Sequence, residues 1–182
     1  MSAETATANE EALTLLDLQP SDRVLEVGFG HGRTIERAAT ALVSGFIAGI
    51  DLSEEMVRMA ERRCRRLIRD GKVALTVGDS DRLPFPDQHF DKVLSVHTVY
   101  FWADPKAHLR EIRRVLAYGG RLVLGFRSKE DKMAEDFPES VYTFYTAEEV
   151  GGLLETSGFE RVDLAHAPGG LIMATACRPL AA

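Results

Sequence analysis

Four polar side chains that could bind or activate a ligand stand at or just after the ends of apolar segments. They are Glu26, Asp51, Asp79 and His97. Carboxylates accept hydrogen bonds from hydroxyl and amino groups, and a histidine near neutral pH can take a proton from a reacting group. One such residue would indicate little, because turns favour short polar residues for capping alone. Four in succession around one glycine-rich loop favour a shared site.

The loop Gly28-Phe29-Gly30-His31-Gly32 limits which cofactor that site would take. Its glycines allow a tight turn and a close approach of backbone to a ligand. A dinucleotide fingerprint has its third glycine at position 33, where this chain has Arg33. That departure disfavours NAD(P). The chain also lacks a GK[ST] motif, which excludes a phosphate-binding P-loop.

Two carboxylates refine the choice of cofactor. Asp51 lies about 20 residues beyond the loop, where a carboxylate can accept from both ribose hydroxyls of NAD or of S-adenosylmethionine (SAM). Asp51 therefore does not discriminate between them. Glu26, just before the loop, would suit the amino group of a zwitterionic cofactor and would repel a pyrophosphate.

The segments that must position these residues alternate between strand and helix patterns. The predicted strands are 23–27, 46–50, 72–77, 92–96, 121–126, 159–167 and 171–177. The predicted helices are 10–18, 33–42, 53–70, 104–116 and 146–156, after a frayed tail at 1–9. Ser53 and Thr146 have helix-capping signatures, and Gly119-Gly120 is expected to end the fourth helix. The alternation implies a mostly parallel sheet covered on both faces, with a closing hairpin at Pro168-Gly169-Gly170.

Length and composition narrow the class of protein. A chain of 182 residues suits one well-buried core, and its formal charge of −6 disfavours a nucleic-acid partner. Cys64 and Cys177 belong to no zinc-binding or disulfide spacing, so no metal is expected. The first residues lack a signal-peptide pattern, and no apolar run approaches the ~20 residues of a membrane span. The expected location is the cytoplasm, without a membrane partner.

Four segments together resemble class I (Rossmann-like) SAM-dependent methyltransferases of the small-molecule "methyltransferase type 11" kind. VLEVGFGHG at 24–32 is similar to the family's first motif, and DLSEEM at 51–56 to its ribose-binding segment. GDSDRLPFPDQHFD at 78–91 resembles the stretch that passes the adenine. RRVLAYGGRL at 113–122 resembles the segment after strand four, although Tyr118 replaces the usual proline.

The resemblance implies an α/β fold, namely a Rossmann-like three-layer sandwich. Its mostly parallel, seven-stranded sheet would close with a C-terminal antiparallel hairpin. Residues 1–19 would form an N-terminal tail and short helix, and 20–182 a single SAM-binding domain. Residues 127–145 would be an insert on the substrate side.

It also implies which residues contact SAM or its product S-adenosylhomocysteine (SAH). They are Glu26, Gly28, Gly30, Gly32, Asp51, Leu52, Met56, Asp79, Ser80, Val96 and His97. Glu26 and the loop backbone would face the methionine moiety, and Asp79 would accept from the adenine amino group. Met56 also lies on the apolar stripe of its helix, so core packing is nearly as good an explanation for it.

The acceptor side is less determined. His97 could act as general base, or it could only bond to backbone or cofactor. Because methyl transfer from a sulfonium depends mainly on in-line approach, no catalytic residue is assigned. His31 is expected to face solvent. The side chains expected to line an apolar acceptor pocket are Tyr100, Trp102, Tyr142 and Tyr145, with Phe101 and Phe144 in the core.

The leading interpretation is therefore methyl transfer from SAM to a small, partly apolar molecule, on oxygen, nitrogen or carbon. A SAM- or SAH-binding regulatory protein without catalysis is the alternative, and an NAD(P)-dependent oxidoreductase is disfavoured. Because the N-terminal leader is short, the pocket is expected to be open or to be closed by a second subunit of a homodimer.

Overall fold

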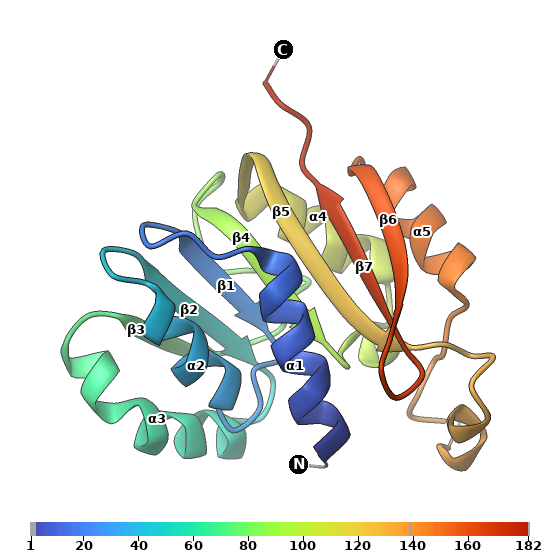
Figure 1. Cartoon of the computed structure of the whole chain (residues 1–182), viewed down its shortest axis with the longest axis horizontal. Helices are drawn as coiled ribbons and strands as arrows, with labels where there is room; N and C mark the ends of the chain where they lie inside the picture. Colours follow the sequence, from blue (N-terminus) through green and yellow to red (C-terminus); the bar gives the residue numbers. More distant parts are fainter. Residues whose placement is uncertain (1–2, 139, 182) are drawn as a thin grey trace.

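One mixed sheet of seven strands forms the centre of the computed structural model, which describes residues 3–138 and 140–181 (Figure 1). The order is β3-β2-β1-β4-β5-β7-β6, and β7 runs antiparallel to both of its neighbours. The strands are β1 (Arg23–Val27), β2 (Phe46–Asp51), β3 (Val73–Val77), β4 (Phe90–Val96), β5 (Leu116–Arg127), β6 (Glu160–Ala167) and β7 (Leu171–Cys177). The predicted fold class, including the closing hairpin, is confirmed.

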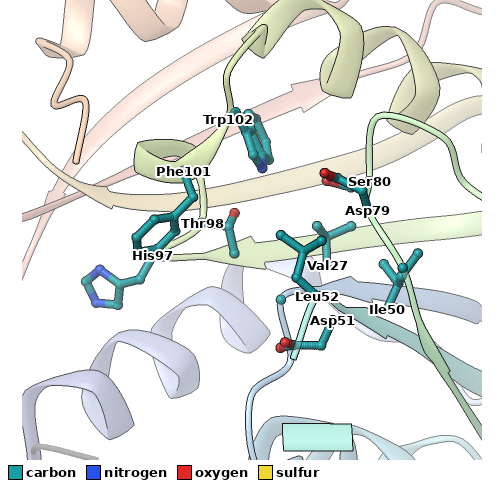
Figure 2. A pocket seen from close by; sticks show the side chains of 12 residues that line it. Val27, Ile50, Asp51, Leu52, Asp79, Ser80, His97, Thr98, Phe101 and Trp102 are labelled. Atoms are coloured by element: carbon teal, nitrogen blue, oxygen red, sulfur yellow. The ribbon is translucent and has the colours of Figure 1, made fainter. Parts of the chain in front are cut away.

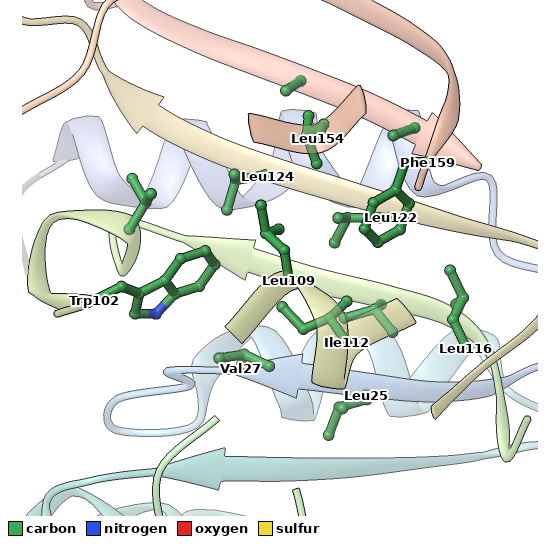
Figure 3. Packing of buried hydrophobic residues seen from close by; sticks show 14 of the residues in the cluster. Leu25, Val27, Trp102, Leu109, Ile112, Leu116, Leu122, Leu124, Leu154 and Phe159 are labelled. Carbon is green, nitrogen blue, oxygen red and sulfur yellow. The ribbon is translucent and has the colours of Figure 1, made fainter. Parts of the chain in front are cut away.

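Helices cover both faces of the sheet and create two apolar layers. The helices are α1 (Ala3–Leu16), α2 (Arg33–Ala41), α3 (Glu54–Arg69), α4 (Pro105–Val115) and α5 (Ala147–Thr156), with short 3-10 turns η1 (Val99–Phe101) and η2 (Lys132–Asp136). The first three helices pack on one face, and α4 and α5 pack on the other. Figure 3 shows Leu109 and Ile112 of α4 packed against Leu25 of β1 and Leu122 of β5. No helix in the described part of the chain is long and apolar enough to cross a membrane.

The two predicted helix caps are confirmed. The Ser53 hydroxyl accepts from the Met56 amide at 3.3 Å, so α3 begins just after β2. Thr146 and Glu149 form a reciprocal capping box at the start of α5. Both caps satisfy amide groups that a helix start leaves without intrahelical partners.

The frayed tail predicted for residues 1–9 is wrong for residues 3–9, which belong to α1. Met1 and Ser2 lie outside the described residues. Ala8 and Ala12 are buried against the sheet, on the same helix face as Leu16. Small alanines mark a buried helix face weakly, and this is why the predicted helix began only at residue 10.

The predicted role of Gly119-Gly120 is also wrong, because both glycines lie inside β5. The helix α4 ends earlier, where Leu116 becomes extended and pairs with Phe90. A side chain on Gly120 would come within 2.9 Å of the Asp91 carbonyl oxygen. The glycine therefore serves close packing of strands and does not end a helix.

The carboxyl end of α4 is closed by a side chain from the far end of the chain. Arg178 is buried, and its Nη1 donates to the carbonyl oxygens of Arg113, Arg114 and Leu116 at 2.7–3.0 Å. A cation at this end also complements the helix dipole. Arg178 thus replaces the glycine cap that the sequence suggested.

A second arginine ties α4 to the loop before β4. Arg114 donates to the carbonyl oxygens of Phe85 and Leu83 at 2.8 and 3.0 Å and forms ion pairs with Glu111 and Asp87. Glu111 in turn accepts from the Leu83 amide at 2.9 Å. This clamp fixes the segment that follows Asp79 and Ser80 at the carboxyl end of β3.

We expect Arg178→Leu to lower the free energy of unfolding by about 2–3 kcal/mol, because three carbonyl oxygens at the end of α4 lose a charged donor. Urea denaturation measures the change. Arg66→Gln, at an exposed position of α3, is the matched control and should stay within about 0.5 kcal/mol of the parent. Equal effects of the two changes would contradict the capping role of Arg178.

Candidate active site

A hollow of about 220 Å³ lies beyond the carboxyl ends of β1, β2, β3 and β4. Four loops contribute its lining, and Figure 2 shows the side chains that they bring to it. The lining residues are Val27, Gly28, Ile50, Asp51, Leu52, Gly78, Asp79, Ser80, His97, Thr98, Phe101 and Trp102. The strand order reverses between β1 and β4, and open α/β sheets bind ligands at such a point.

The loops after β1 and β4 approach each other closely at this point. Gly28 has a φ of +73°, and a Cβ there would lie 2.2 Å from the Thr98 methyl carbon. Its amide donates to the Ile50 carbonyl oxygen at 2.8 Å. Thr98 is hydrogen-bonded to Ser95 on β4. Only a glycine fits this crossing, so the turn is set by packing as well as by backbone conformation.

Asp51 holds two loops together with one carboxylate. Its Oδ2 accepts from the Gly30 amide at 2.8 Å, and its Oδ1 accepts from the Ser53 amide at 2.9 Å. Gly30 has a φ of +55°, and a Cβ there would meet nothing within 4 Å. The loop therefore presents open space at Gly30. At Gly32, by contrast, a Cβ would lie 2.6 Å from that of Ala60 on α3.

Glu26 is the most perturbed acid of the site. It is 4 % exposed, and burial raises the pKa of its carboxyl from about 4.5 to about 8. A hydrogen bond from the Thr34 side chain opposes this increase, and the neighbouring Asp51 adds to it. Its Oε2 is fully buried and has no hydrogen-bond partner among the described residues. Such an atom costs stability unless a donor reaches it, and a cationic donor satisfies it best.

Asp79 and Ser80 form one end of the hollow, together with Trp102. His108 of α4 lies behind them, with Nδ1 2.8 Å from the Ser80 hydroxyl and 3.6 Å from Asp79 Oδ1. Its ring stacks on Trp102 at 4.9 Å between centroids and 8° between planes. Trp102, expected on the acceptor side, is thus joined through His108 to the Asp79 end of the hollow.

His97 lies at the other end and has a φ of +61°. Its Nδ1 is 3.1 Å from the Tyr100 hydroxyl, and the oxygen of that hydroxyl accepts a hydrogen bond from the Arg127 amide. Figure 2 shows its ring directed away from Asp79 and Ser80. The side chain therefore lies between the hollow and the segment that begins at Arg127.

The η1 turn reverses two expectations about aromatic residues. Phe101, expected in the core, is 49 % exposed and lines the hollow, whereas Tyr100, expected at the acceptor pocket, is buried. The 3-10 turn points Tyr100 toward Arg127 and leaves Phe101 outside. Phe144 is half-buried beside Tyr100, with ring centroids 4.8 Å apart.

The segment 127–145 brings further rings next to Phe101. Tyr142 lies 4.9 Å from both Phe101 and Phe137, measured between ring centroids. We call Phe101, Tyr142 and Phe137 the aromatic strip. Tyr145 is half-buried against the core, and its carbonyl oxygen accepts from the Lys129 amide at 2.9 Å. That bond closes the base of the segment.

Several residues predicted to contact the cofactor or the acceptor lie outside the lining of the hollow. They are Glu26, Gly30, Gly32, Met56, Val96, Tyr100, Tyr142 and Tyr145. Met56 is half-buried, and Val57 takes its expected place on the inner stripe of α3. Val96 packs into the apolar layer between the sheet and the helices α1 to α3. His31, expected in solvent, is half-buried, and the Arg63 guanidinium bonds to its carbonyl oxygen.

Sequence reasoning missed Thr98 and His108. Thr98 directly follows His97, so its place at the strand end was a usable signal. His108 adjoins Leu109 on a predicted amphipathic helix, and nothing in its spacing sets it apart from a core residue. Among the described residues, no group of three or more His, Cys, Asp or Glu side chains could hold a metal ion.

Comparisons with known proteins found a matching family model and similar chains. A family model described as "Methyltransferase domain" matches residues 25–124. YdaC of Bacillus subtilis, named as an uncharacterized methyltransferase, is 30 % identical over 164 residues, which cover 90 % of this chain and 86 % of YdaC. A SAM-dependent methyltransferase structure from Aquifex aeolicus is 25 % identical, with a TM-score of 0.80 over 93 % of this chain and 88 % of that one.

A third relative carries a more specific name. The 27-O-demethylrifamycin SV methyltransferase of Amycolatopsis mediterranei is 35 % identical over 129 residues, which cover 67 % of this chain. The match covers only 47 % of that enzyme, so the chain spans about half the length of this relative.

The buried Glu26 carboxyl should make the free energy of unfolding depend on pH. The folded-state pKa of Glu26 is about 8, so the folded chain keeps a proton that the unfolded chain loses above pH 4.5. This contribution to stability is complete below pH 4.5 and is lost as pH rises toward 8. The glutamine in Glu26→Gln cannot ionise, so this variant does not lose stability in this way as pH rises. In urea titrations, the free energy of unfolding of Glu26→Gln minus that of the parent should therefore increase by about 2 kcal/mol from pH 6 to pH 8.5.

Glu54→Gln, at an exposed glutamate of α3, is the control and should show no such trend. A constant difference between Glu26→Gln and the parent across this pH range would contradict the buried, protonated state of Glu26.

Proposed function

This chain belongs to the class I SAM-dependent methyltransferases, and we propose that it methylates a small, partly apolar molecule whose ring or chain packs on the aromatic strip. The unpartnered, buried oxygen of Glu26 beside the glycine loop carries the cofactor half of this proposal. The exposed ring of Phe101 at the hollow carries the acceptor half.

The residues at the loop fit the polar groups of SAM. The Glu26 carboxylate would accept from the ammonium group, and the open space at Gly30 leaves room for the methionine moiety. Asp51 already uses one lone pair of each oxygen for the loop amides and can accept from ribose hydroxyls with the others. When bound there, SAM supplies an electrophilic methyl group on a sulfonium.

We place the adenine at the Asp79 end of the hollow. Asp79 would accept from its amino group beside the Ser80 backbone, and Leu52, 63 % exposed at the rim, would cover the ring. Met56 and Val96 contribute through packing in this arrangement, since neither lines the hollow. Gly32 acts through the close approach of the loop to α3.

We assign the main catalytic contribution to positioning and to exclusion of water. His97 is the candidate general base, and its tautomer decides whether it can act. If Nδ1–H donates to Tyr100, Nε2 is the basic atom of the ring and would be the one to take the acceptor's proton. If Tyr100 donates to Nδ1, Nε2 carries the hydrogen and the ring cannot act as a base.

The acceptor class follows from the volume and lining of the site. The hollow of about 220 Å³ is smaller than the ~300–1,000 Å³ of usual small-molecule pockets, so it cannot enclose cofactor and acceptor together. The acceptor would extend outward along Phe101, Tyr142 and Phe137. The relative named for 27-O-demethylrifamycin SV supports an acceptor that is a small molecule. A second subunit would cover this open side in the homodimer version of the proposal.

We expect a methyl-transfer assay with SAM and a panel of phenols, aromatic amines and polycyclic compounds to yield an acceptor. Phe101→Ala should raise the KM for that acceptor about tenfold and leave the KM for SAM nearly unchanged, because about 1.5 kcal/mol of apolar contact is lost. Val43→Ala, at an exposed position away from the hollow, is the control.

Methylation of none of these aromatic compounds would contradict the assigned acceptor class. An unchanged KM in Phe101→Ala would contradict the role of the aromatic strip.

A further inference from the structure

His108 is a buried polar residue that the site as described does not use. It lies on the inner face of α4, is 4 % exposed, and does not itself line the hollow. Its three neighbours Asp79, Ser80 and Trp102 all do. A buried imidazole needs hydrogen-bond partners, and here each partner is part of the wall where the adenine is placed.

The contacts of His108 reach that wall in two ways. Nδ1 is 2.8 Å from the Ser80 hydroxyl and 3.6 Å from Asp79 Oδ1, while the ring face stacks on the indole of Trp102. Asp79 itself is 44 % exposed at its side chain, and among the described residues its carboxylate accepts one long bond, from the Asp81 amide at 3.4 Å. The His108 ring lies within 3.6 Å of this carboxylate and so limits the directions in which it can turn.

The protonation state of His108 suits that restraint. Burial lowers its pKa below the ordinary value, although Asp79, Asp81 and Asp104 oppose the shift, so the ring is neutral at physiological pH. A neutral ring carries one N–H, and the two oxygens beside Nδ1 favour the tautomer with its hydrogen there. In that tautomer the Nδ1 hydrogen is donated to the Ser80 hydroxyl, and its positive end also faces Asp79.

We propose that His108 is a positioning residue that holds Asp79 and Ser80 in place and thereby sets selectivity for adenine over a deaminated base. This inference rests on the cofactor placement proposed above. Adenine offers an amino donor to the Asp79 carboxylate, whereas hypoxanthine offers a carbonyl oxygen that the carboxylate repels. A fixed carboxylate enforces that difference, but a carboxylate free to turn toward solvent weakens it.

Two variants separate the donor of His108 from its ring. His108→Phe keeps a ring to stack on Trp102 and removes the donor. His108→Asn keeps an amide donor near the Nδ1 position and removes the ring. Trp102 is the single tryptophan of the chain, so its fluorescence reports binding at this wall. Each protein is titrated with SAH and with the SAH analogue that carries inosine in place of adenosine.

We expect His108→Phe to weaken SAH binding about tenfold and to leave the affinity for the inosine analogue nearly unchanged. The ratio of the dissociation constant for the inosine analogue to that for SAH should then fall about tenfold. His108→Asn should keep the ratio within about twofold of the parent and should alter the Trp102 emission before ligand is added. A parent-like ratio in His108→Phe, whatever its thermal stability, would overturn the positioning role and leave His108 as a packing residue.

Asp79→Asn in the same titrations separates this inference from the cofactor placement. The Asn amide can donate to the hypoxanthine oxygen, so this variant should lose the preference for SAH over the inosine analogue and the ratio should collapse to near one. If Asp79→Asn collapses the ratio and His108→Phe does not, the role of His108 is wrong while the placement stands. If the parent binds SAH and Asp79→Asn leaves the ratio unchanged, the placement of adenine is wrong and this inference is overturned with it.

Discussion

A carboxylate buried at the end of a central strand is the constraint around which this site is built. Glu26 lies on β1 between β2 and β4, where little water reaches it, and one of its oxygens has no hydrogen-bond partner among the described residues. A fold keeps such a group at a cost in stability. The cost is explained if a cationic group from a ligand completes the site, which is what the ammonium of SAM offers.

The surrounding loops are ordered mainly by bonds between side chains and backbone. Asp51 joins the amides of Gly30 and Ser53, Arg114 clamps the loop after Asp79, and Arg178 closes the far end of α4. Asp51 and Arg114 link segments that are distant in sequence but meet near the hollow, whereas Arg178, which follows the antiparallel strand β7, acts at the opposite edge of the sheet. The cofactor end is therefore preorganised. The acceptor end, by contrast, leaves Phe101 exposed to solvent.

The sequence predicted the sheet, its hairpin and two helix caps, because apolar periodicity and capping residues act locally. It failed where the deciding contact comes from elsewhere in the chain. Gly119-Gly120 resembled a helix end, but the end of α4 is set by Arg178, about 60 residues away in sequence. The start of α1 was missed because alanines that pack on a sheet look like a neutral tail.

The candidate site shows the same division between local and distant effects. Gly28, Asp51 and Asp79 line the hollow and could be proposed from sequence because strand ends and glycines are local signals, whereas Glu26 lies buried outside the lining. The inversion of Tyr100 and Phe101 depends on one 3-10 turn, whose direction no period predicts. His108 was missed because its partners come from another loop, and only the folded chain brings them to it.

Calorimetry of SAH binding at pH 7, repeated in buffers of different ionisation enthalpy, tests the central claim most directly. With a pKa of about 8, Glu26 is mostly protonated before binding. Contact with the ammonium group favours the carboxylate, so binding should release about one proton into the buffer. The observed enthalpy should then change with the ionisation enthalpy of the buffer. SAH binding with no proton release, or with proton uptake, would contradict the account.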